Sequence, residues 1–108
     1  MSADYTQEKL WQAVDILVGR CTIQERLKNA AMYLIRLKGF KDDLAFPGDL
    51  DAQTRLDHII GRLTSVPTTG NEGTIEASTR ALSDDEGQEL SREIFSLYCR
   101  ATELASML

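Results

Sequence analysis

The apolar residues of this chain recur at intervals of three and four, and this spacing is the feature that most constrains its fold. Such intervals place apolar side chains on one side of an α-helix, whereas a half-buried strand needs them at every second position. Only two prolines, Pro47 and Pro67, interrupt the pattern, and both lie in segments that also contain glycine. The sequence therefore predicts an all-helical protein.

Capping residues and breaking residues divide this pattern into separate helices. Thr22 with Glu25, and Ser83 with Glu86, have the spacing of a capping box, and Asp4 is the predicted N-cap of the first helix. Four principal helices are expected over residues 5–18, 23–38, 50–65 and from 84 onward, with a short fifth helix over residues 75–82. This pattern predicts a single domain over residues 1–108, folded as a mostly antiparallel all-α bundle of four principal helices.

Each principal helix has an apolar side that we expect to face the core. In the first helix this side consists of Leu10, Trp11, Ala13, Val14, Leu17 and Val18. The apolar residues of the last helix follow a heptad spacing. They are Leu90, Ile94, Leu97, Ala101, Leu104 and Leu108. We expect this seam to face the core, with Cys99 packed beside it. The alternative is that the apolar residues Met107 and Leu108 are buried in a two-fold dimer.

The charge of the chain is small in total but uneven along its length. The net charge is −5, which argues against a general binder of nucleic acid or anionic membranes. A DNA-binding helix-turn-helix is disfavoured because the first helix is acidic. No apolar run is long enough to cross a bilayer, and the N-terminal segment lacks the pattern of a signal peptide. We therefore expect a cytoplasmic protein with neither a membrane nor a nucleic-acid partner.

The residues that most often perform chemistry are few in this sequence. The one histidine, His58, is predicted on the solvent side of the third helix. Cys21 and Cys99 are expected to be reduced thiols, because the N-terminal segment shows no secretion signal. No histidine base accompanies Cys21, which argues against a catalytic thiol. No spacing of histidine, cysteine or carboxylate matches a metal site, and no glycine pattern matches a phosphate-binding loop. We therefore expect no catalytic residue, no metal and no cofactor.

The strongest binding signal is a basic segment that contains the second helix. Residues 20–41 hold six basic residues and one acidic residue, a net charge of +5, so the rest of the chain carries −10. Methionine and tyrosine lie among the cations of the polar face, and arginine, methionine and tyrosine are enriched at protein interfaces. The predicted partner-binding residues are Arg26, Lys28, Asn29, Met32, Tyr33 and Arg36. The alternative is that this face pairs with acidic helices of its own bundle.

These observations predict a small non-catalytic protein that acts by binding other proteins through its helix faces. Adaptors, anti-regulators and chaperone-like proteins belong to this class, and the partner is either a different protein or a second copy in a homodimer. The alternative is a bundle that binds a small molecule or acts as an enzyme, with an internal pocket lined by Trp11, Phe95 and Tyr98.

Overall fold

The computed structural model describes residues 3–37, 44–67 and 73–107, and these residues form five helices without a strand. The helices are α1 (Ala3–Leu17), α2 (Ile23–Ile35), α3 (Leu50–Leu63), α4 (Thr74–Arg80) and α5 (Asp84–Ser106). They pack against one another as a helical bundle, so the predicted fold class is confirmed. The predicted end of the second helix at residue 38 and the last seam position, Leu108, lie outside the described residues.

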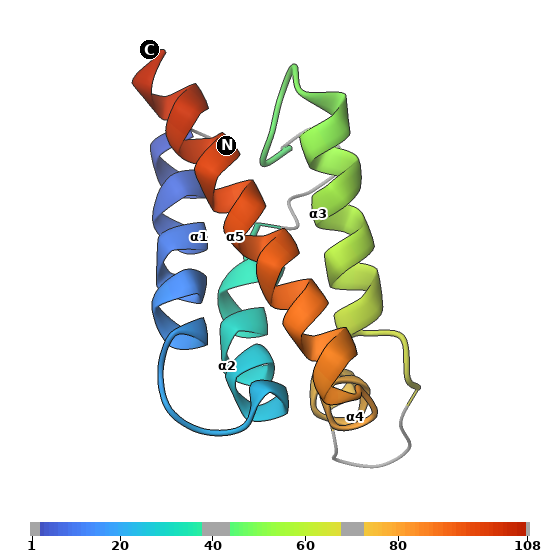
Figure 1. Cartoon of the computed structure of the whole chain (residues 1–108). Coiled ribbons are helices and arrows are strands. Elements are labelled where there is room, and N and C mark those ends of the chain that lie inside the picture. The colour runs from blue at the N-terminus through green and yellow to red at the C-terminus, as the bar shows by residue number, and fades with distance from the viewer. Residues whose placement is uncertain (1–2, 38–43, 68–72, 108) are drawn as a thin grey trace.

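The four long helices alternate in direction along the chain (Figure 1). In this view α1 and α3 run downward at the two sides, α2 returns between them, and α5 returns across the front with a strong tilt. The short helix α4 lies at the base and is seen end-on. α2 contacts each of the other four helices, and the most extensive packing joins α1 to α5 and α1 to α2.

Side-chain caps explain where three of the helices begin. The Thr22 hydroxyl accepts a hydrogen bond from the Glu25 amide at 3.1 Å, and Ser83 and Glu86 form a complete capping box at the start of α5. α3 begins after Asp49, whose carboxylate accepts from the Ala52 amide at 3.1 Å. The two capping positions predicted at Thr22 and Ser83 are therefore confirmed.

Two helix starts differ from the prediction. Asp4 is not an N-cap, because α1 begins at Ala3 and Asp4 lies in its first turn. There the negative carboxylate is stabilised by the positive end of the helix dipole. α4 begins at Thr74, one residue earlier than predicted, and its N-cap position, Gly73, has no side chain that could cap the helix. Neither difference changes the order or the number of the helices.

One cluster of buried apolar side chains forms the core and draws on the long helices and the loop before α3. The heptad seam of α5 faces this core, since Leu90, Ile94, Leu97 and Ala101 are all buried. Phe46 enters it from the loop before α3 and is among the largest fully buried side chains. Cys99 is exposed rather than packed beside the seam, so that prediction is wrong. The core is thus filled mainly by leucine, isoleucine and alanine.

Candidate functional site

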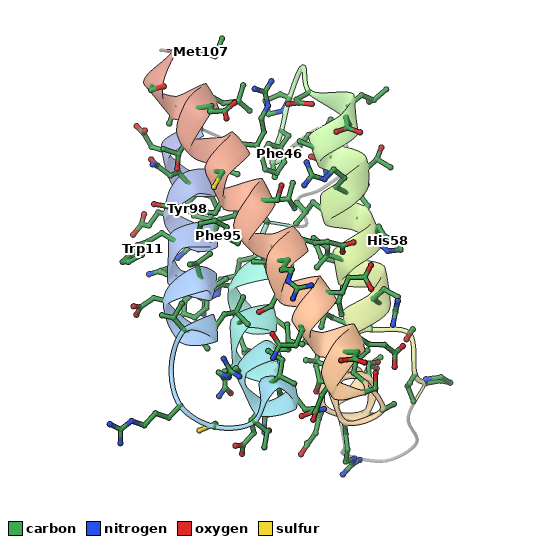
Figure 2. All side chains as sticks on the ribbon, viewed as in Figure 1. Trp11, Phe46, His58, Phe95, Tyr98 and Met107 are labelled. Atoms are coloured by element: carbon green, nitrogen blue, oxygen red, sulfur yellow. The ribbon has the colours of Figure 1, made fainter. Side chains whose placement is uncertain are left out.

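Three aromatic side chains meet at the surface where α1 packs against α5. The ring centroids of Trp11 and Tyr98 lie 6.1 Å apart, and those of Phe95 and Tyr98 lie 6.4 Å apart, with tilted ring planes. Trp11 remains 50% exposed and Phe95 53% exposed. Figure 2 shows the three side chains together on the α1 side of α5. We call Trp11, Phe95 and Tyr98 the aromatic cluster.

The aromatic cluster does not enclose the internal pocket that the sequence suggested. The three residues were correctly expected to lie near one another, but their rings border two open hollows on the surface. The first hollow, of about 350 Å³, contains Trp11 and Tyr98 together with Asp4, Gln7 and Glu8. The second hollow, of about 320 Å³, lies beyond Phe95 toward the end of α1. The aromatic cluster therefore lies on the surface and borders both hollows.

Helical spacing explains why these residues share one surface. Trp11, Val14 and Val18 are separated by three and four positions, so they follow one side of α1 and its end, and Phe95 and Tyr98 have the same relation on α5. Val14 is buried, whereas Val18 is 75% exposed. The apolar stripe of α1 is thus wider than the core can cover, and its outer edge faces solvent. The expectation that Trp11 and Val18 lie in the core is wrong.

On its opposite side, α5 packs against α3, and polar contacts connect the two helices at their surface. The contacts are Arg62 Nη2 with Glu86 Oε2 at 2.9 Å, Arg55 Nη2 with Ser96 Oγ at 2.7 Å, and Arg100 Nε with Asp49 Oδ2 at 2.6 Å. Each of these contacts joins α3 or its N-cap residue to α5. The α1 side of α5 is the one that leaves large aromatic surface without a covering element.

The predicted partner-binding residues of α2 are divided between exposed and engaged positions. Asn29, Met32 and Arg36 are exposed, and Met32 is 57% accessible to solvent. The other three, Arg26, Lys28 and Tyr33, are half-buried. The structure therefore presents the centre of the predicted face outward and turns its edges toward neighbouring helices.

The two edges of this face contact different helices. On the α1 side, the Arg26 Nη1 atom donates to the Leu17 carbonyl oxygen at 2.6 Å, and the Tyr33 ring lies 5.8 Å from the Lys9 Nζ atom. The Tyr33 ring also lies 5.7 Å from the guanidinium of Arg36. These contacts hold Arg26 and Tyr33 against α1, whereas the Met32 side chain is exposed to solvent.

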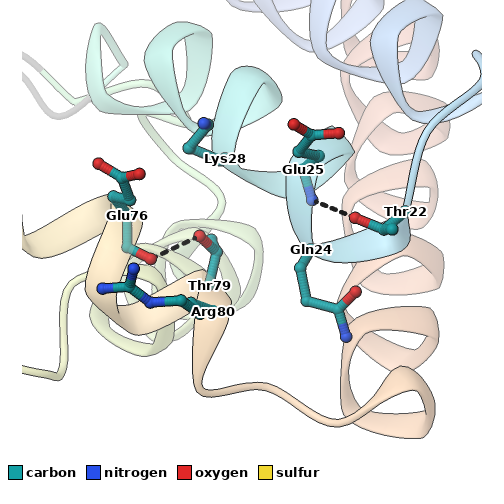
Figure 3. A pocket seen from close by; sticks show the side chains of 7 residues that line it. All are labelled: Thr22, Gln24, Glu25, Lys28, Glu76, Thr79 and Arg80. Atoms are coloured by element: carbon teal, nitrogen blue, oxygen red, sulfur yellow. Dashed lines mark hydrogen bonds between the residues drawn. The ribbon is translucent and has the colours of Figure 1, made fainter.

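On the other edge, Lys28 borders a hollow of about 380 Å³ between α2 and α4 (Figure 3). The hollow is lined by both acidic and basic residues, and the hydroxyl groups in its lining form hydrogen bonds with backbone atoms. The Thr22 hydroxyl caps α2, and the Thr79 hydroxyl donates to the carbonyl oxygens of Ile75 and Glu76 at 2.9 and 3.2 Å. The Gln24 Nε2 atom donates to the Leu82 carbonyl oxygen at 3.0 Å. The bond from Gln24 to Leu82 joins α2 to the residues that follow α4, so these polar groups have structural roles.

The groups with shifted pKa values are helix caps and their partners. The hydrogen bond from Arg100 lowers the pKa of Asp49, and the same bond raises the pKa of Arg100. The Ser83 backbone amide lowers the pKa of Glu86 by donating to its carboxylate. His58 is exposed on α3 (Figure 2), as predicted. Within the described ranges, no group of three or more histidine, cysteine or acidic residues could hold a metal ion.

This chain matches no protein-family model, no curated protein and no solved structure. Among the residues placed by the structure, no helix combines the length and apolar character needed to cross a membrane. The aromatic cluster and the outer face of α2 are therefore the surface features from which a function can be inferred.

Proposed function

We propose that this chain is a non-catalytic interaction or regulatory protein, of adaptor or chaperone-like type, that binds a protein partner through its helix faces. The observation that carries this proposal is the aromatic cluster. Tryptophan and tyrosine are the residues most enriched among those that dominate binding energy at protein interfaces. Covering the exposed half of Trp11 and of Phe95 would contribute on the order of 1 kcal/mol for each ring.

The surroundings of the aromatic cluster have the composition of an interface. Val18 extends the apolar surface along α1, and polar groups flank it at both ends. Asp4 and Glu8 lie in the hollow beside Trp11, while Arg92 lies in the hollow beside Phe95. An apolar centre with a polar rim is the usual arrangement at a specific protein interface.

The outer face of α2 supplies a second contact in this proposal. Met32 and Arg36 are exposed there, and the surrounding segment is basic in a chain that is otherwise acidic. Charge complementarity favours an acidic partner surface. A second copy of this chain meets that requirement, because its remainder carries a net charge of −10. We therefore include a homodimer in the proposal.

The test compares two double variants with a control. W11A/F95A removes two of the three rings of the aromatic cluster, and M32A/R36E removes an apolar side chain and reverses a charge on the α2 face. Leu50→Ala is the control, because it removes an apolar side chain that is even more exposed, at 79%, but lies on α3. Light scattering at about 100 μM, a concentration at which a dimer with a Kd of about 1 μM is formed, measures self-association. Co-purification of the tagged proteins from native lysate measures binding of other proteins.

We expect the wild type and Leu50→Ala to retain the same dimer or the same co-purified partner, and W11A/F95A to lose it while remaining folded. M32A/R36E is expected to weaken the association less than the aromatic variant does. Retention of both dimer and partner by W11A/F95A would contradict the proposal. So would a wild-type protein that is monomeric and recovers no partner.

A further inference from the structure

The hollow beyond Phe95 combines a mainly apolar wall with two cationic side chains. It lies between the end of α1, the start of α2 and the first half of α5, and its volume is about 320 Å³. Aliphatic side chains from α1 and α2 and the Phe95 ring form most of its wall. We call it the arginine hollow, and its defining residues are Val14, Val18, Ile23, Arg26, Arg92 and Phe95.

Both charged residues that line the arginine hollow are cations. Arg26 reaches it from α2 and Arg92 from α5, and the remaining polar lining residues, Gln88 and Ser91, are uncharged. Among the residues that the structure places, no carboxylate forms an ion pair with either arginine. By contrast, the neighbouring hollow beside Trp11 contains two carboxylates and no cation. The two ends of this surface therefore attract groups of opposite charge.

The Arg26 side chain is held in place by one hydrogen bond, but its Nε–H donor has no hydrogen-bond acceptor. Its Nη1 atom donates to the Leu17 carbonyl oxygen at 2.6 Å, which anchors the guanidinium at the end of α1. Its Nε atom is buried and has no hydrogen-bond acceptor. A guanidinium presents several donors in one plane and binds a carboxylate through two parallel hydrogen bonds. Because the Nε atom is buried, a carboxylate in the hollow would be bound by the terminal nitrogen atoms of the Arg26 guanidinium.

We propose that the arginine hollow binds a carboxylate attached to an apolar chain. The carboxylate would lie between Arg26 and Arg92, and the chain would lie against Phe95, Val14 and Val18. A free aliphatic acid and the C-terminal residue of a peptide both have this chemistry. The site goes beyond the proposed function, because the isolated chain would bind such a ligand without a protein partner.

The test titrates small probes into isotope-labelled protein and follows backbone amide shifts by NMR. Octanoate is the free acid, and an acetylated leucine tripeptide with a free C-terminus is the peptide acid. Octanol, octylamine and the amide of the same tripeptide are the matched controls without a negative charge. We expect saturable shifts around the arginine hollow with at least one of the two carboxylates, and the responding one identifies the source. The uncharged and cationic controls are expected to bind at least about tenfold more weakly.

Arginine variants separate a specific site from general attraction to cations. Arg92→Gln removes an exposed cation of the hollow, and Arg20→Gln removes an exposed cation outside it. We expect R92Q to weaken carboxylate binding by about tenfold and R20Q to leave it unchanged. R26Q should have the same effect as R92Q, with thermal unfolding showing whether loss of the bond to Leu17 alters the fold.

Three results would each overturn the proposal. The first is no saturable binding of either carboxylate up to about 10 mM, a range that still detects very weak affinity. The second is equal binding of octanoate and octanol, which would show that the arginines add nothing. The third is equal affinity of the R92Q and R20Q variants. None of these three results depends on whether the aromatic cluster binds a protein, so failure here leaves the proposed function standing.

Discussion

At the scale of single residues, the least predictable positions lie at the edges of apolar arcs. Helical spacing places Trp11 and Val18 on the apolar side of α1, yet both are half or more exposed. The spacing gives the direction of a side chain from its own helix axis. It does not give the position of the neighbouring helix, which decides how much of that arc is covered. Cys99 was misplaced for the same reason, since it lies just outside the seam of α5.

Asp49 allows a residue-scale prediction about acid stability. Its carboxylate accepts from Arg100 Nε at 2.6 Å and from the Ala52 amide at 3.1 Å, and these bonds lower its pKa below the ordinary value of 3.8. The ion pair therefore stabilises the fold above that pH and is lost as the pH falls through the folded-state pKa. Asp49→Asn keeps an acceptor for the helix cap but removes the charge.

We expect the melting temperature of the wild type to fall more than that of D49N when the pH is lowered from about 5 to about 2. Circular dichroism during thermal unfolding measures this difference. Part of the fall should persist in the variant, because the pKa of Glu86 is also lowered in the folded state. Identical pH profiles for the two proteins would show that Asp49 and Arg100 do not stabilise the fold.

At the scale of helices, the caps predicted at Thr22 and Ser83 are confirmed, whereas the N-cap predicted at Asp4 is wrong. Ser83 and Glu86 satisfy each other's backbone amides in the structure, and Thr22 caps α2. These interactions are local, so residues three positions apart determine them. The tilt of α5 across the bundle could not be predicted, because it depends on how side chains from several helices pack together.

Two helical glycines provide a matched prediction about packing. Gly61 lies on the exposed side of α3 with open space around its Cα atom, so Gly61→Ala should raise the free energy of unfolding by about 0.5–1 kcal/mol. Gly87 is buried in α5, where an added Cβ would lie 2.9 Å from Ile23 Cγ1 and 3.0 Å from Ile23 Cγ2. Gly87→Ala should therefore lower the free energy of unfolding, by about 1 kcal/mol.

Denaturant unfolding of the two variants measures both changes against the same wild type. The helix propensity gained is the same for each substitution, so the difference between them reports the contact of Gly87 with α2. Equal stabilisation by the two substitutions would mean that α5 and α2 are farther apart at this point than the structure places them.

At the scale of the whole molecule, charge and exposed apolar surface are distributed over different helices. The sequence predicted the basic character of α2 and named all three members of the aromatic cluster. It could not predict that these three aromatic side chains lie on the surface, because their exposure depends on how far the neighbouring helices cover the outer edges of α1 and α5. The arginine hollow was also beyond the sequence, since its lining comes from three helices.

The central claim is that the aromatic cluster is a protein-binding surface, and site-specific photo-crosslinking tests it most directly. A benzophenone amino acid replaces Phe95 in one protein and His58, an exposed residue of α3, in another. On irradiation in native lysate, we predict a discrete product that joins position 95 to a second copy or to a partner protein. The product should be absent at position 58 and diminished when Trp11→Ala is added. Equal products from both positions, or a product from position 58 alone, would contradict the account.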